Sequence, residues 1–261
     1  RDLFRTDGSR FRQSLRCGCG AVLVYLEMRQ LSERQKKMIT TMQDQVYQIL
    51  KTEICEGCYS PGQWLQEKEL SAHLHVSRSP VRDALRKLSN DGLVEIIPNK
   101  GTFVRVFTAS DINDVYEFRV LVESYSIRQS PKNLTPKLRE TITACLSNLQ
   151  RTYRDNDRKN YIEYDTVLHA LIISLSGNGL IESTYEKIHS LLQPFRIYSL
   201  VSRQRFDESI VEHEGIVKAI LAGDVGRAEE INRQHLTLAK EKVVEYITSE
   251  EYLSKCVHTE L

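Results

Sequence analysis

Apolar residues recur from residue 41 onward with the spacing of helices that bury one face. Val46 and Leu50 mark the first such face, so we expect a helix that ends before the turn at residues 60–62. A second helix buries Leu70, and after a tight turn a third helix covers residues 78–90. Three short helices in this order predict a helix-turn-helix unit.

The period then changes from that of a helix to that of strands. Residues 93–97 and 102–106 are rich in β-formers, and the turn at residues 98–101 separates them. This pattern predicts a small hairpin, or wing, directly after the third helix.

Beyond Phe107 the sequence shows no further convincing strand, and helical periods fill it. The six expected helices cover residues 109–129, 135–155, 158–175, 179–200, 207–222 and 224–252. We therefore predict a mainly α fold, with an N-terminal winged helix-turn-helix followed by an all-α six-helix bundle.

These patterns divide the chain into four parts. Residues 1–40 show no sustained period, and we expect a disordered tail or an upstream extension, with Met28 or Met38 as the natural start. The remaining parts are a winged helix-turn-helix domain over 41–106, an all-helical ligand-binding domain over 107–252 and a tail over 253–261.

Composition indicates a soluble protein with ordinary cores. The hydrophobic content of the 261 residues is 41%, and no apolar run reaches the length that crosses a bilayer, so we expect no membrane partner. The six cysteines occur in a chain that is large enough to fold without disulfides and has no convincing secretory signal, which favours a reducing cytoplasm.

Two close cysteine pairs raise the alternative of a zinc or redox site. Cys17 and Cys19 are too close for the usual zinc knuckle. Cys55 and Cys58 have the usual spacing, but no matching second pair follows them. We therefore assign neither pair a metal.

Charge differs slightly between the halves of the chain. Residues 36–106 carry ten Lys and Arg against eight Asp and Glu, whereas residues 107–261 carry nineteen against twenty-three. A DNA-facing first half fits this asymmetry, although solvated surface fits it too.

Three arginines follow one another at helical spacing on the third helix. Arg78, Arg82 and Arg86 lie one turn apart, on the face opposite the leucines. Ser77 and Ser79 stand at the start of this helix, where free backbone N–H groups favour phosphate. Such a stripe can enter a major groove and contact guanine edges or phosphates, or it can be a solvated face.

The span 41–106 closely resembles the winged helix of the GntR family. The resemblance is carried by Leu65, Glu67, Leu70, residues 76–82, Ala84, Leu85, Leu88 and residues 92–94, with Pro61-Gly62 before them and residues 99–101 after them. It implies binding of double-stranded operator DNA through Lys68, Ser77, Arg78, Ser79 and Arg82, with the wing residues Asn99 and Lys100 near the minor groove. We add Arg86 from its place in the arginine stripe and Gly101 from the wing turn to the candidate DNA-binding set.

The second half contains a candidate metal site. Asp165 and His169 are four residues apart on one predicted helix, so a carboxylate and an imidazole share a face and can share an ion. His213 and His235 each lie on a later amphipathic helix. A single histidine is more often hydrogen-bonded or exposed than a ligand, and we assign His189 in that way, together with His73, His75 and His258.

Residues 109–250 resemble the FCD effector domain of the FadR-like branch of this family. The resemblance implies that Asp165, His169, His213 and His235 together hold a divalent metal, with zinc first and nickel or manganese as alternatives. It also implies that Arg119 and Asn178 bind a small carboxylate effector. An ion pair with Glu123, one turn away, explains Arg119 as well.

The combined pattern predicts a metabolite-responsive transcriptional regulator of repressor type, not an enzyme. We expect a homodimer, because two-fold assemblies read paired half-sites. A metal-dependent enzyme acting on small carboxylates is the first alternative. The chain has no evident general base for it, and an enzyme would have no use for the N-terminal DNA-binding domain. The second alternative is a helical scaffold whose wing binds protein.

Overall fold

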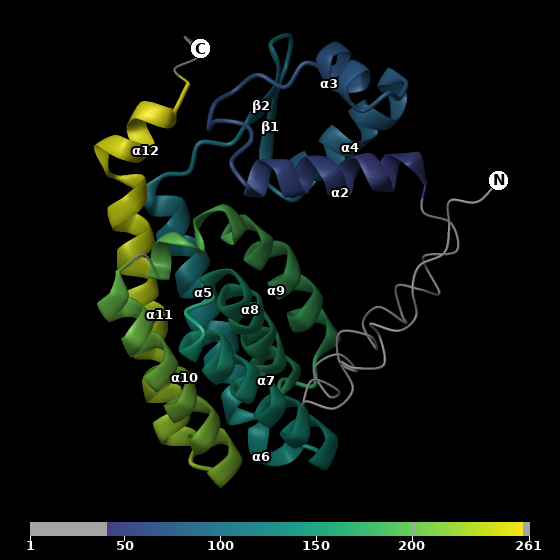
Figure 1. Ribbon diagram of the computed structural model, residues 1–261. Coiled ribbons are helices and arrows are strands. Elements are labelled where there is room, and N and C mark those ends of the chain that lie inside the picture. The colour runs from purple at the N-terminus through teal and green to yellow at the C-terminus, as the bar shows by residue number, and fades with distance from the viewer. Residues whose placement is uncertain (1–40, 201, 258–261) are drawn as a thin grey trace, which may run out of the picture.

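The computed structural model describes residues 41–200 and 202–257. An N-terminal winged helix lies across one end of a larger helical domain (Figure 1). The expected tail at 1–40, the pair Cys17 and Cys19, and His258 lie outside the described residues.

The N-terminal part is a helix-turn-helix with a wing. Its elements are α2 (Met42–Cys55), α3 (Glu67–His73), α4 (Arg78–Asn90), β1 (Val94–Ile97) and β2 (Gly101–Val104). The apolar face of α4, with Val81 and Leu88 fully buried, packs on Val46 and Leu50 of α2 in one core. Burial of this shared face fixes the angle at which α4 projects.

The wing is a two-stranded antiparallel hairpin. Its register runs from Val94 opposite Val104 to Ile97 opposite Gly101. Asn99 adopts φ 61° in the turn, a left-handed conformation that asparagine tolerates better than most residues. The predicted wing is therefore present.

The second part is all helical among the described residues. Its elements are α5 (Ala109–Arg128), α6 (Ser130–Asn133), α7 (Pro136–Arg154), α8 (Arg158–Ser174), α9 (Gly179–Leu191), η3 (Gln193–Phe195), η4 (Tyr198–Leu200), α10 (Arg203–Ala222), α11 (Val225–Ile247) and α12 (Glu250–Lys255). The predicted fold class is confirmed. None of the described helices is long and apolar enough to cross a membrane.

Three helix boundaries differ from the prediction. The helix expected over 179–200 ends at Leu191, because Pro194 has no N–H for the helical ladder, and two 3-10 turns follow. The next helix begins earlier, at Arg203, where the Ser202 side chain accepts from the Arg205 amide. The helix expected over 224–252 ends at Ile247 as α11, and Ser249 caps a separate short helix, α12.

Candidate metal centre and nucleic-acid interface

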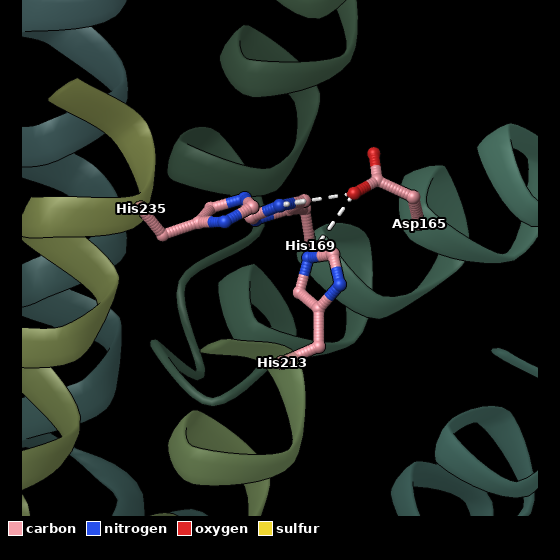
Figure 2. Close-up of side chains that lie close together, drawn as sticks. All are labelled: Asp165, His169, His213 and His235. Atoms are coloured by element: carbon pink, nitrogen blue, oxygen red, sulfur yellow. Dashed lines mark ion pairs between the residues drawn. The ribbon is translucent and has the colours of Figure 1, made fainter. Parts of the chain in front are cut away.

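Four side chains from three helices converge inside the helical domain (Figure 2). Asp165 and His169 come from α8, His213 from α10 and His235 from α11, and one ligand atom of each lies within 4.8 Å of the others. The three imidazoles are buried, whereas Asp165 is partly exposed. The four residues implied by the resemblance are thus brought together in space.

Each imidazole uses its Nδ1 atom for a protein partner. The contacts are His169 Nδ1 to Glu123 Oε2 at 2.8 Å, His213 Nδ1 to the Tyr161 hydroxyl at 3.0 Å, and His235 Nδ1 to Glu212 Oε2 at 2.7 Å. A carboxylate on one ring nitrogen keeps the proton there and leaves Nε2 as the lone-pair donor. His169 and His235 therefore have the arrangement that metal-bound histidines commonly show.

The Nε2 atom of His213 tests whether the cluster fits a metal. It is buried and makes no hydrogen bond within the part of the chain that the structure describes, although Asp165 Oδ1 lies 3.1 Å away. A buried polar atom without a partner is unfavourable by about 1–3 kcal/mol. A cation between these two atoms would satisfy both, so the donor set fits a divalent metal, and its mixed nitrogen and oxygen ligands suit zinc, nickel or manganese.

The pKa values of Asp165, His169 and His235 are shifted in the direction that metal coordination needs. Burial lowers the pKa of His169, and burial together with His213 lowers the pKa of His235 to about 3. Burial opposes ionisation of Asp165, but His213, His169 and Arg196 hold its pKa well below the usual range. His169 and His235 are therefore neutral, and Asp165 is ionised, near pH 7.

The carboxylates behind the histidines are also ionised. Burial would raise the pKa of Glu123, yet His169 and Arg119 hold it at about 2. Burial likewise opposes the ionisation of Glu212, and its contacts with His235 and Arg205 hold its pKa at about 2. Both groups can therefore accept hydrogen bonds from the imidazoles.

A small cavity of about 20 Å³ adjoins this cluster. Its lining includes Asp165, His169 and His235, together with the guanidinium-bearing residues Arg119, Arg196 and Arg205. A site for one water needs about 10–15 Å³, so a metabolite of several carbons fits only if lining side chains move.

Arg119 is only 4% exposed, and its Nε atom donates to Glu123 Oε1 at 3.0 Å. The internal ion pair considered from the sequence is therefore present. Among the described residues, the Nη2 atom of Arg119 is buried without a hydrogen-bond partner, so this residue of the cavity lining has one unused donor.

Asn178 does not join this cavity. Its side chain accepts from the amides of Leu180 and Ile181, it is exposed, and it caps the start of α9. Its carbonyl is occupied by backbone donors and has a capping role, and the expected effector contact of Asn178 stays a prediction.

Several groups at the site carry no clear signal in the sequence. Tyr161 lies on α8 and Arg196 directly after η3, and no motif links either residue to the cluster. Glu212 is adjacent to His213 on α10, and neighbouring residues of a helix point in different directions. Glu212 instead contacts His235 on the next helix. Glu212 lies one turn beyond Glu208 and two turns beyond Arg205, whose guanidinium contacts Glu212 at 2.7 Å. This spacing is the one sequence signal that places the three residues on a shared helix face.

The expected DNA-contacting side chains lie on the surface of the winged helix. Those that are exposed are Lys68, Ser77, Arg78, Ser79, Arg82, Arg86, Asn99 and Lys100, and Gly101 is partly exposed. Ser77 precedes the first residue of α4 without a side-chain cap bond, so the amides of the first turn are open to an anion.

The arginine stripe on α4 is not uniform. Arg82 donates to both oxygens of Glu67, at 2.8 and 2.7 Å, and Arg86 lies 3.9 Å from Asp83. Arg82 is therefore held by a carboxylate, whereas the Arg78 guanidinium has no such partner within the described residues.

The backbone at the base of the wing requires a glycine at position 101. Its φ is 129°, and a Cβ atom there would lie 2.4 Å from Trp64 Nε1. Only glycine allows this backbone conformation beside the indole. Gly101 therefore lets the wing turn close over Trp64.

Family models match both parts of the chain. The model "Bacterial regulatory proteins, gntR family" matches residues 42–104, and the model "FCD domain" matches residues 114–238. An HTH-type transcriptional regulator of Streptomyces ambofaciens is 32% identical over 178 residues, which cover 68% of this chain and 74% of that protein.

Two further relatives cover most of their own length. The HTH-type transcriptional repressor RspR of Escherichia coli is 25% identical over 81% of this chain and 92% of its own. A solved structure described as a GntR transcriptional regulator from Rhodococcus sp. RHA1 is 26% identical, with TM-score 0.66 over 78% of this chain and 97% of that one.

Replacement of Glu212 by Gln should weaken metal binding. The amide cannot hold the Nδ1 proton of His235 as a carboxylate does, and loss of such a partner lowers metal affinity about 10- to 100-fold. Glu214→Gln is the matched control, because Glu214 contacts Gln150 and Lys218 instead. Titration of the metal-free protein with zinc against a competing chelator measures both variants, and equal affinities would contradict the assigned partner.

Proposed function

The chain belongs to the gntR family of bacterial regulatory proteins and carries an FCD domain, and we propose that a metal ion and a small carboxylate control its binding to operator DNA. It is a DNA-binding transcriptional regulator and not an enzyme. The observation that carries the proposal is the convergence of Asp165 and three histidines, each with its Nδ1 atom engaged.

Asp165, His169, His213 and His235 are the proposed ligands. Zinc is the first candidate and nickel or manganese are alternatives, since all three accept mixed oxygen and nitrogen ligands. When bound, the ion supplies a fixed positive charge that attracts an anion. Glu123, Tyr161 and Glu212 orient the three imidazoles from behind.

Charge balance supports a carboxylate as the effector. Arg119, Arg196 and Arg205 lie at the cavity with the carboxylates Glu123, Asp165 and Glu212 close behind or beside them. Three positive and three negative groups leave the buried site balanced, so an added divalent cation calls for an anion. The unpaired Nη2 donor of Arg119 is the protein group proposed to grip it.

The proposed DNA interface combines α4 with the wing. Its residues are Lys68, Ser77, Arg78, Ser79, Arg82, Arg86, Asn99, Lys100 and Gly101. Exposure of the eight side chains and the open first turn of α4 support this interface. Repression is the proposed direction of control, because relatives such as RspR are named repressors.

Substitution of the α4 arginines should weaken DNA binding without loss of the fold. Arg78→Ala and Arg82→Ala each remove an exposed side chain, and we expect about 1–3 kcal/mol lower affinity per lost base contact. Arg151→Ala on α7 is the control, since its side chain is half exposed beside Asp155 and distant in sequence from α4. Duplexes selected from a random pool provide the operator, titrated at fixed salt, and wild-type affinity in both variants would exclude α4 as the reading helix.

The regulator should act as a homodimer. One winged helix buries little DNA surface, and two-fold assemblies read paired half-sites. Light scattering at micromolar concentration should give twice the chain mass of 30.2 kDa. A monomer with and without selected DNA would count against this assembly, whereas a dimer only on DNA would place assembly on the operator.

Loss of a proposed ligand should lower metal content and stability together. His213→Ala and His235→Ala each remove one of the donors that join α8, α10 and α11, so the metal no longer favours the folded state. We expect metal content below that of wild type and a lower melting temperature in the presence of zinc. His73→Ala on exposed α3 is the control, and full occupancy in both site variants would remove the proposed metal centre.

A further inference from the structure

Arg196 links the metal-site carboxylate to another part of the domain. Its guanidinium lies 3.4 Å from Asp165 Oδ2, donates to the Ile162 carbonyl at 3.3 Å, and contacts His189 Nε2. The side chain is 7% exposed overall. Because Asp165 Oδ1 faces His213 and Oδ2 faces Arg196, one carboxylate serves two separate neighbours.

The same arginine lines two cavities. One is the small cavity beside the histidines, and the other, of about 530 Å³, lies between the two domains. The second is lined from the winged helix by Ile54, Tyr59 and Leu93 and from the helical domain by the segment 193–198. Arg196 therefore lies between the proposed metal site and the junction of the two domains.

The segment that carries Arg196 supports the winged helix. The 3-10 turn η3, which ends beside Arg196, contacts α2, the helix that lies against the helical domain in Figure 1. Leu191, just before this turn, packs on the winged-helix core and on a core of the helical domain. A shift of this segment therefore changes the packing of α2.

We propose that Arg196 couples occupancy of the Asp165 site to the winged helix, because its guanidinium joins the metal-binding carboxylate to the segment that supports α2. This inference rests on the proposed metal site. A cation at Asp165 shares the negative charge that otherwise faces Arg196, so the pair between Asp165 and Arg196 weakens. The Arg196 guanidinium and the segment 193–198 then adopt a second arrangement, and α2 moves with them.

Hydrogen exchange with zinc alone tests this coupling. The α2 face formed by Gln48, Lys51, Thr52 and Cys55 borders the junction, so peptides covering residues 46–56 report on it. In the wild-type chain, zinc should change amide exchange there by about fivefold or more, the usual scale of coupling between two sites. Arg196→Gln should bind zinc and lose this response.

Two further variants separate coupling from general damage. Arg203→Gln removes an exposed arginine that pairs with Asp207, and it should keep the full response. Arg196→Lys keeps the charge without the planar fork, and it should bind zinc with a weaker response than wild type. A full zinc response in α2 of both zinc-binding Arg196 variants would overturn the proposal.

A double-mutant cycle tests the coupling even if the wild-type chain takes up no zinc, an outcome that would refute the metal site by itself. Asp165→Asn removes the charge that faces Arg196, and it should alter exchange in residues 46–56. The same change made on the Arg196→Gln background should have no further effect. Equal effects of Asp165→Asn on both backgrounds would show that Arg196 does not carry the signal.

Discussion

The helical domain depends on the rule that a buried charge needs a partner. Its interior holds carboxylates that pair with guanidinium groups and imidazoles, within one helix for Arg119 and Glu123 and between elements for further carboxylate contacts. These further contacts are Glu123 to His169, Asp165 to Arg196 and His213, and Glu212 to His235. Each contact joins two different elements, so the pairing fixes how α5, α8, α10 and α11 sit against one another and where the four proposed ligands converge.

The same rule has the opposite consequence at the surface. The bidentate pair between Arg82 and Glu67 is made by side chains that are 54% and 32% exposed, and exposed ion pairs contribute only about 0.2–1 kcal/mol. Water and phosphate can replace such a partner at little cost. The buried pairs therefore hold the geometry of the Asp165 and histidine cluster, whereas the surface pair orients Arg82 and leaves it able to exchange its partner.

Local signals predicted the fold, and tertiary contacts limited the prediction of the site. Apolar periodicity and turn residues indicated the helix-turn-helix, the wing and six long helices. These signals did not predict the helix end before Pro194 or the helix caps at Ser202 and Ser249. Spacing paired Asp165 with His169, and family resemblance added His213 and His235. The partners Tyr161 and Glu212 are set by packing between helices, which no local pattern records.

The small size of the cavity bears on how a ligand can act at a distance. A ligand shifts a conformational equilibrium only if it binds the two arrangements with different affinity. With about 20 Å³ beside the histidines, any molecule larger than a water must displace lining groups before it fits. Arg196 is one of these groups, and the 3-10 turn that precedes it has weaker hydrogen bonding than an α-helix. A molecule of that size therefore fits only a rearranged lining, and the 3-10 turn beside Arg196 contacts α2.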